Sequence, residues 1–429
     1  MKPLSFMLIA GETSGDLLGA ELVRALQESN GIRSLPFPPV FFGAGGPRMA
    51  EAGVELALDL TRHSVIGLSD VLKKISQFKR IFDRLVKLAL EREPDVILCV
   101  DFSGFNRRFA RRIKRYVRAR RGPFLNWNPK IIQYVSPQVW ASRPGRAAQL
   151  ERDLDLLLCL FPFEKDWYAA RAPKLRVEYV GHPMLERFAG GSPGHFGEPA
   201  SADGPLPGVR RADTGAAGEP PRTPPDKAPS GGPSVAGPPS QILLLPGSRS
   251  AELRRHLPVM TAAARRILAV RTGARFRVIL PNEELRPLVG NEPTAIPDLA
   301  IQIGGLAAAL RNADLAITKS GTITLECACF GVPAVVLYKT SWPTYLAGRL
   351  MLNVDHLAMP NLLAGEVLYP EFIQHAATPD NIARSALELL NDPERCAAVR
   401  SGLAKVVKSL GGTGASRRAA RAVLNLVFS

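Results

Sequence analysis

The sequence has few cysteines, few aromatic residues and no long apolar run. Its five cysteines lack metal-ligand spacing, which predicts free thiols in a reducing compartment and excludes a disulfide framework. No run reaches the roughly 18 apolar residues of a membrane-spanning helix. The apolar run at 4–10 has no basic head, so we interpret it as a strand and not as a secretory signal. These features predict a cytoplasmic protein.

Acidic residues are also scarce, with 39 Asp and Glu against 55 Lys and Arg, for a net charge of +16. Such a balance suits nucleic acid, anionic lipid or a phosphorylated substrate, and it also occurs in arginine-rich proteomes. Aromatic residues are not interleaved with the basic ones, as base stacking would require, so nucleic acid is the least favoured partner. A chain of 429 residues is expected to form two domains, each with its own core.

Residues 190–240 differ from the rest, because 23 of these 51 positions are glycine or proline. The segment has too few large apolar residues to build a core. We interpret it as a linker between two domains or as an inserted surface loop. The predicted organisation is therefore a first domain at 1–189, a second at 241–410 and a C-terminal helix within 411–429.

Short apolar runs alternate with helical patterns on both sides of that segment. The expected strands are 4–10, 38–43, 95–100, 131–135, 156–161, 176–180, 241–246, 275–280, 299–303, 314–318 and 333–337. The expected helices are 16–29, 69–91, 105–119, 250–272, 306–312, 322–330, 379–391 and 415–427. This alternation predicts an α/β fold with parallel sheets and right-handed crossovers. Two such halves indicate two Rossmann-like domains facing a cleft.

Two strands of the second half run into small-residue turns that open helices. A helix start presents unpaired N–H groups and a positive dipole end, and glycine lets a phosphate approach the backbone. Two such turns predict a diphosphate site for a nucleotide sugar. The turn residues are Gly247, Ser248, Arg249, Ser320, Gly321 and Thr322.

Charged residues beside these turns have two interpretations each. Arg249 either clamps phosphate oxygens or is a solvated arginine. Glu326 lies one helical turn after Thr322, where it either accepts both ribose hydroxyls or is a polar residue on a partly buried helix.

In the first half, a carboxylate follows a buried strand. Asp101 comes directly after 95–100, at the strand end where open parallel sheets bind ligands. It is a candidate base for a hydroxyl proton, or alternatively a cap for the helix near Phe105. Asp153 and Asp155 match a metal-binding D-x-D pattern, but they run straight into a strand, and we interpret the pair as coincidental.

The first strand is followed by an acidic turn that contains Glu12, Ser14 and Asp16. Carboxylates there would repel phosphate and suit sugar hydroxyls or an amine, which predicts an acceptor loop. The alternative is structural, with Thr13 or Ser14 as a helix N-cap and Asp16 as a dipole partner.

Two basic amphipathic stretches lie at 69–91 and 105–121, and the second holds nine basic residues and no acid. Such helices either lie on anionic lipid or bury an apolar stripe in the core while their basic face is solvated. The pattern leaves both open.

Eight motifs in order along the chain resemble the bacterial lipid-A-disaccharide synthases, which are GT-B glycosyltransferases. The resemblance covers the chain except 190–240. The motifs are AGETSGD at 10–16, GGPRM at 45–49, YVSPQVWA at 134–141, FPFEK at 161–165, GHP at 181–183, LPGSR at 245–249, SGT at 320–322 with Glu326, and PNLLAG at 360–365.

This resemblance implies an inverting transfer from UDP-2,3-diacylglucosamine to 2,3-diacylglucosamine 1-phosphate. The products would be the β-1,6 lipid A disaccharide 1-phosphate and UDP, formed without metal or cofactor. The resemblance implies Asp101 as base, Arg249 and Glu326 as UDP ligands, and Asn361 lining the site. It also implies a homodimer through the C-terminal region and a peripheral location on the inner face of the inner membrane.

Three features depart from the family pattern. Ser103 and Gly104 stand where proline and a second aspartate are common, Ser142 replaces an aromatic residue, and 190–240 is unusual. Two other functions stay open at this point. One is a UDP-N-acetylglucosamine transferase or 2-epimerase, and the other is a non-catalytic nucleotide-sugar-binding protein.

Overall fold

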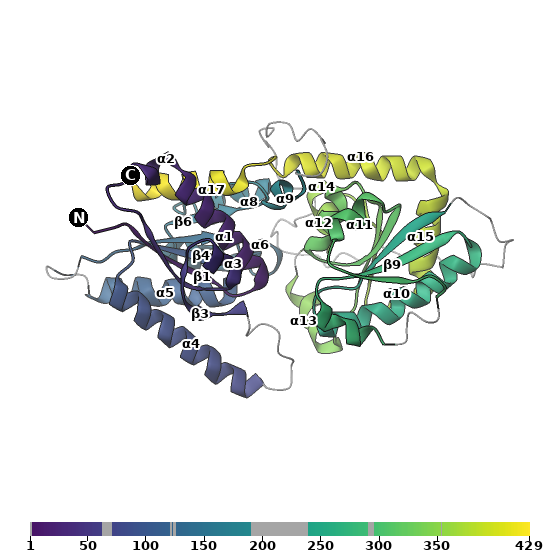
Figure 1. The fold of residues 1–429 in the computed structure, drawn as a ribbon, viewed down its shortest axis with the longest axis horizontal. Helices are drawn as coiled ribbons and strands as arrows, with labels where there is room; N and C mark the ends of the chain where they lie inside the picture. The colour runs from purple at the N-terminus through teal and green to yellow at the C-terminus, as the bar shows by residue number, and fades with distance from the viewer. Residues whose placement is uncertain are drawn as a thin grey trace. The chain divides into compact units, whose positions relative to one another are not determined.

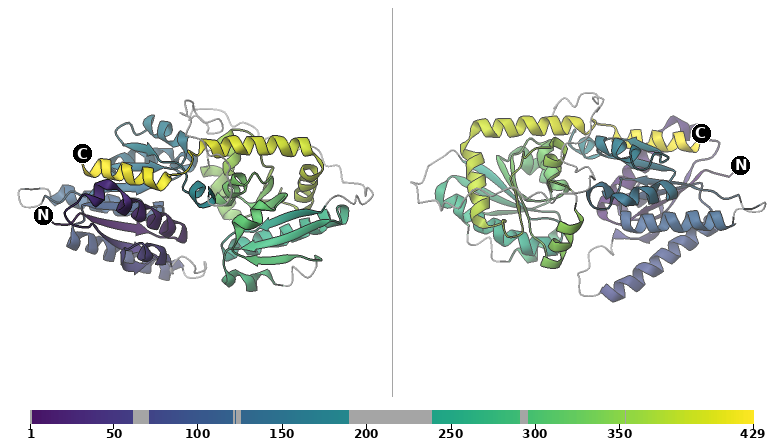
Figure 2. Two further views of the ribbon diagram at one scale, coloured as in Figure 1. Left: turned by 45° about the horizontal axis from the view of Figure 1, so that its top comes forward. Right: turned by 180° about the vertical axis from the view of Figure 1, so that it is seen from behind.

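The computed structural model describes residues 2–61, 71–120, 122, 126–189, 239–290, 296–352 and 354–429 (Figures 1 and 2). They belong to two compact units. The first comprises Met1–Pro205 together with Lys408–Ser429, and the second comprises Leu206–Val407. The segment predicted as a linker, 190–240, lies outside the described residues except for its last two positions.

The first unit is built on a seven-stranded parallel sheet in the order β3-β2-β1-β4-β5-β6-β7. Its central strands are buried apolar runs, which places them inside the unit with helices on both faces. The strands are β1 (Ser5–Ala10), β2 (Val40–Gly45), β3 (Glu55–Asp59), β4 (Val96–Val100), β5 (Lys130–Tyr134), β6 (Leu156–Cys159) and β7 (Val177–Tyr179).

The helices of this unit follow its strands in an α/β alternation. They are α1 (Thr13–Glu28), α2 (Asn30–Arg33), α3 (Pro47–Glu51), α4 (Val71–Arg92), α5 (Ser103–Arg120), α6 (Val139–Ser142), α7 (Ala147–Asp153), α8 (Pro162–Ala169) and α9 (Met184–Ala189). The described part of α4 packs its apolar side on α5, because the Phe82 ring meets Phe105 edge-on at 5.4 Å and Leu85 is fully buried. The core-facing alternative thus holds for this part of the helix.

The second unit has a six-stranded parallel sheet in the order β10-β9-β8-β11-β12-β13. Its strands are β8 (Ser240–Leu245), β9 (Ala274–Leu280), β10 (Ala300–Ile303), β11 (Leu315–Lys319), β12 (Ala334–Tyr338) and β13 (Glu371–Ile373). Its helices are α10 (Ser250–Val270), α11 (Leu306–Arg311), α12 (Thr322–Cys329), α13 (Trp342–Met351), α14 (Met359–Ala364), α15 (Pro379–Asn391) and most of α16 (Pro393–Ser409).

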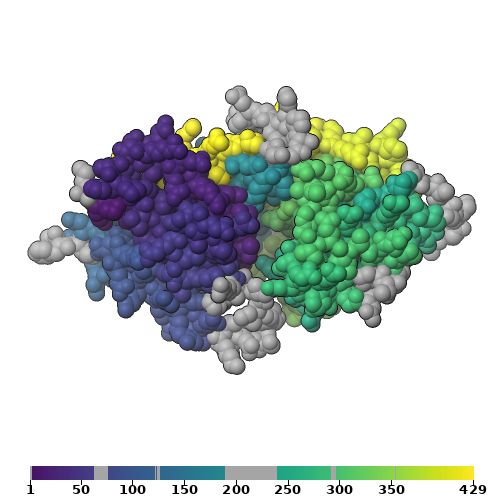
Figure 3. Space-filling view, in the orientation of Figure 1, coloured from purple at the N-terminus to yellow at the C-terminus, as the bar shows by residue number. Residues whose placement is uncertain are grey.

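The C-terminal segment returns to the first unit. Helix α17 (Ala415–Val427), predicted at the same residues, packs on α1, and its Ala419 and Val423 are fully buried in the core of that unit. In the space-filling view the yellow C-terminal residues therefore lie beside purple atoms of the first unit as well as green atoms of the second (Figure 3).

No helix in the described residues is long and apolar enough to cross a membrane. Two strands that the sequence pattern did not predict, β3 and β13, lie at sheet edges and are only half-buried.

Candidate active site

The two turns predicted to bind a diphosphate follow neighbouring strands of the second sheet. Strands β8 and β11 pair in parallel, so the turns after Leu245 and Lys319 lie at the same carboxyl edge. Gly247 has φ 122° and Gly321 has φ 137°, a region that favours glycine. A Cβ at Gly247 would also collide with the Glu252 side chain. Both glycines are therefore required by the backbone path.

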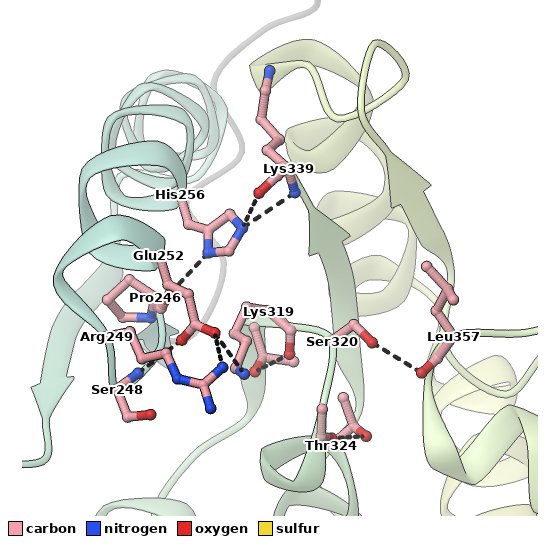
Figure 4. A network of polar contacts seen from close by, with 12 residues as sticks. Pro246, Ser248, Arg249, Glu252, His256, Lys319, Ser320, Thr324, Lys339 and Leu357 are labelled. Atoms are coloured by element: carbon pink, nitrogen blue, oxygen red, sulfur yellow. Dashed lines mark hydrogen bonds and ion pairs between the residues drawn. The ribbon is translucent and has the colours of Figure 1, made fainter. Parts of the chain in front are cut away.

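The side chain of Glu252, in the first turn of α10, joins the two turns (Figure 4). Its carboxylate accepts a hydrogen bond from the Ser248 backbone N–H at 3.1 Å. It also lies 3.3 Å from Lys319 Nζ and 3.8 Å from the guanidinium of Arg249. One N–H donor and two cations thus converge on a carboxylate at this edge, which shows that the position holds negative charge.

The side chain of His256 holds the first turn in place through hydrogen bonds to the backbone. Its Nδ1 lies 2.9 Å from the Pro246 carbonyl, and its Nε2 accepts the Lys339 N–H at 3.1 Å. Because Nε2 accepts, the ring proton belongs on Nδ1, where it donates to Pro246. Burial lowers the pKa of His256, which favours this neutral form. The histidine therefore ties the end of β8 to the end of β12.

The second turn is anchored by its own side chains. The Ser320 hydroxyl donates to the Leu357 carbonyl at 2.9 Å, and the Thr324 hydroxyl donates to Gly321 O at 2.7 Å (Figure 4). Thr322 begins α12 and is exposed, while Glu326 lies one turn further on and is half-buried. The turn residues predicted from the sequence are thus brought together, with Arg249 exposed at the start of α10.

Asn361 is placed differently from its expected role. Its side chain is fully buried, donates to the Tyr369 carbonyl and to Glu371, and accepts the Leu368 and Tyr369 N–H groups. An amide with all these bonds has no capacity left for a ligand. The residue stabilises the connection between α14 and β13 instead of lining a site.

In the first unit, Asp101 lies at the carboxyl edge of the sheet, as predicted. Asp101 and Phe102 have φ values of 48° and 44°, which are strained for residues other than glycine. The Asp101 carbonyl accepts hydrogen bonds from Asn106 Nδ2 at 2.9 Å and Gln133 Nε2 at 3.0 Å. Two buried amides thus hold the turn, and the half-exposed carboxylate accepts the Ser14 hydroxyl at 3.2 Å.

The departures at Ser103 and Gly104 change little in this turn. Both belong to the start of α5, and a Cβ at Gly104 would meet no atom within 4 Å. Asn106, which follows them, keeps its bonds to the turn. The structure thus retains the strained conformation of Asp101 without the usual proline and aspartate.

The acidic turn after β1 divides into two parts. Glu12 is the N-cap residue of α1 without a side-chain cap bond, so neither Thr13 nor Ser14 has the capping role considered above. Asp16 is buried, and its oxygens accept three backbone N–H groups, from Gly46, Arg48 and Met49, at 2.8–3.0 Å. Its carboxylate caps α3 and does not face an acceptor.

The D-x-D pair has structural partners as well. Asp155 pairs with Lys114 at 2.7 Å and accepts the Ile131 N–H, whereas Asp153 is buried and points one oxygen toward Arg152 at 3.5 Å. Among the described residues, no three His, Cys, Asp or Glu side chains form a metal-binding group.

Lys319, Glu252 and His256 are the site residues that the sequence pattern missed. Lys319 ends a strand, and Glu252 and His256 lie on α10 at positions that a helical pattern assigns to a partly buried face. The spacing of three residues between Arg249 and Glu252 can be read from the sequence. The contact between Glu252 and Lys319 cannot, because it depends on the pairing of two strands in the sheet.

Two parallel α/β units of this kind define the GT-B class of glycosyltransferases and related epimerases. The solved structures that are similar include a putative UDP-N-acetylglucosamine 2-epimerase from Listeria monocytogenes, with a TM-score of 0.55, 15% identity, and coverage of 98% of this chain and 96% of that one. A UDP-GlcNAc 2-epimerase from Methanocaldococcus jannaschii has a TM-score of 0.53, 12% identity, and coverage of 98% and 99%. At these identities the likeness concerns the fold alone.

The sequence comparisons go further. The family model of lipid-A-disaccharide synthetase matches residues 6–199 and 238–426. The lipid-A-disaccharide synthases of Trichlorobacter lovleyi and Myxococcus xanthus are each 34% identical over 99% of this chain and 98% of their own length. The chain therefore belongs to the lipid-A-disaccharide synthase family, the glycosyltransferases that make the lipid A disaccharide.

Proposed function

We propose that the chain transfers diacylglucosamine from UDP-2,3-diacylglucosamine to the 6-hydroxyl of 2,3-diacylglucosamine 1-phosphate, with inversion at the donor carbon. The observation that carries the proposal is the pair of glycine turns joined by Glu252. Two helix starts, Lys319 and Arg249 supply positive charge there, which suits a diphosphate better than a neutral ligand.

In this mechanism the first unit supplies the base. Asp101 takes the proton from the acceptor 6-hydroxyl while that oxygen bonds to the anomeric carbon, and the bond from this carbon to the UDP oxygen breaks. Glu12 and Ser14 lie at the same sheet edge and are proposed to contact the acceptor. Arg249 and Lys319 stabilise the departing diphosphate.

The remaining predicted residues have supporting roles. Glu326, one turn inside α12, is proposed to accept the ribose hydroxyls of UDP, while Gly321 and Thr322 present backbone N–H groups. Ser320 is proposed to shape the turn, because its own N–H donates to the Leu337 carbonyl at 3.1 Å. The dimer and the inner-membrane location stay proposals that depend on the family resemblance.

Release of UDP, measured with acylated and non-acylated donor and acceptor pairs, tests the function. We expect release only when both sugars are present and acylated, together with a β-1,6-linked product detected by NMR. Asp101→Asn is the control that should bind UDP without turnover. Epimerisation of UDP-N-acetylglucosamine, or UDP binding without a disaccharide product, would contradict the proposal.

A further inference from the structure

Helix α13 (Trp342–Met351) is the one described helix of eight or more residues that buries none of its side chains. It exposes Trp342 by 64%, Leu346 by 60% and Leu350 by 80%. These three residues are spaced by four, so they share one helical face. Apolar side chains exposed together on one surface indicate an interaction site.

The helix lies at the sheet edge that carries the diphosphate turns. It begins four residues after β12 ends, and β12 pairs in parallel with β11, whose end carries the second turn. His256 reinforces the connection, because it links Pro246 of the first turn to Lys339 just before α13. The apolar face and the charged turns are therefore neighbours within one unit.

The composition around α13 favours a lipid surface over a protein partner. Residues 339–352 contain no acidic residue, and Arg349 is exposed, which complements an anionic headgroup layer. Trp342 and Tyr345, in edge contact at 5.6 Å, supply the amphipathic rings that lie at membrane–water interfaces.

The exposed apolar area of α13 also favours a lipid surface over a protein partner. The five exposed apolar side chains between Trp342 and Leu352 present on the order of 500 Å², whereas a stable protein–protein interface buries about 800 Å² on each partner. A short helix with leucine and tryptophan beside basic residues matches a segment that lies in the interface plane.

We propose that α13 docks on the anionic bilayer that carries the acylated substrates, with Trp342, Leu346 and Leu350 in the acyl region. The proposal rests on the proposed function for its partner, since a lipid-linked sugar must be taken from a bilayer. It assigns a membrane contact to the second unit, beside the diphosphate turns.

Co-sedimentation of the full chain with vesicles of phosphatidylethanolamine and phosphatidylglycerol tests this assignment. The triple variant Trp342→Ser, Leu346→Ser, Leu350→Ser should lower the vesicle partition coefficient at least about tenfold, because three apolar anchors are lost. The matched control is Val270→Ser with Val367→Ser. These residues are 39% and 64% exposed but lie toward the opposite, amino-terminal edge of the sheet. The control should partition within twofold of the unmodified chain.

Two further measurements keep the result interpretable. Tryptophan emission should shift to the blue when vesicles are added, and this shift should be lost in Trp342→Phe. UDP affinity by calorimetry should be equal in all variants, which shows that the second unit is folded. If the unmodified chain binds vesicles but releases no UDP, the proposed function fails while this inference stands.

Two outcomes would overturn the inference. One is vesicle binding of the triple variant within twofold of the control. The other is a dimer of the unmodified chain, seen by light scattering, that becomes a monomer in the triple variant while vesicle binding is unchanged, since α13 would then bind a second copy.

Discussion

The two units present opposite charge at the same edge of similar parallel sheets. In the first unit the strand ends carry Glu12 and the strained Asp101. In the second unit they carry glycine turns, Arg249 and Lys319 around one carboxylate. Because the sheets are alike, the difference comes from a few residues after the strand ends. The comparison shows how one architecture, used twice, can carry an acidic edge in one unit and a cationic edge in the other, which are the sites we propose for the base and for the diphosphate.

The most damaging change should be Asp101→Asn. The amide keeps the size and the Ser14 contact but cannot take a proton, so we expect turnover to fall by about 10²–10⁴. UDP affinity, measured by calorimetry, should be unchanged because the turns proposed to bind UDP belong to the other unit. Weakened UDP binding in this variant would contradict the proposal that the first unit supplies the base and the second unit binds UDP.

Arg249→Ala should lower turnover by about 10²–10³, since one donor to the departing diphosphate is lost. The thermal midpoint should change little because the side chain is 68% exposed. The control is Arg254→Ala, which removes an exposed arginine from the same helix and should leave turnover intact. Equal kcat in the Arg249 variant and its control would contradict the assigned role.

Asp16→Asn separates structural carboxylates from functional ones within the first unit. The new NH₂ group would face either the Arg48 N–H or the Gly46 and Met49 N–H groups, so at least one buried hydrogen bond is lost, at a cost of about 1–3 kcal/mol in the free energy of unfolding. Urea denaturation measures this cost. The exposed Glu28→Gln on the same helix should be neutral. A stable Asp16 variant with lost turnover would instead place this carboxylate in the site.

The smallest effect concerns pH in the first unit. Burial lowers the pKa of His182 to about 4, so the folded state resists protonation. The stability it contributes is present above pH 6.5 and is lost as pH falls toward 4, with a slope of about 1 kcal/mol per pH unit. His182→Asn should remove this contribution, which is measured as the difference between the urea stabilities of the unmodified chain and the variant from pH 4 to 6.5.

Titration of Glu164 has the opposite effect on the pH dependence of stability. Burial raises its pKa to about 7, so its contribution is complete below pH 4.5 and is lost as pH rises through 7. The His182 variant should therefore become more stable as pH falls over this range, until other groups titrate. Glu164→Gln should steepen the histidine slope. An unchanged profile in both variants would show that neither buried group governs the pH dependence.

Much of the fold was predictable because buried strands such as β4 and β11 are unbroken apolar runs. The edge strands β3 and β13 were missed for the opposite reason: they are short and half-buried, and they carry no such run. The sequence pattern did not predict helix α13. A helical period is recognised where an apolar face alternates with a polar face, and the exposed side of α13 is itself apolar.

The placement of candidate site residues was predictable where it follows directly from position along a strand, as for Asp101 and the two glycine turns. It was not predictable where the partner lies far away in sequence. The spacing around Asp16 does not reveal that its oxygens accept hydrogen bonds from backbone N–H groups 30 or more residues away. Asn361 likewise looks available in the sequence, yet the bonds that occupy it come from residues at the start of β13.

The return of α17 to the first unit has a consequence for biosynthesis. Its Ala419 and Val423 belong to a core whose residues outside α17 precede them by more than 230 positions. A ribosome must therefore translate the entire second unit before the core of the first unit, beside α1, has all its residues. The chain also passes between units twice, so a protease cut within 190–238 would leave the halves tethered through α16.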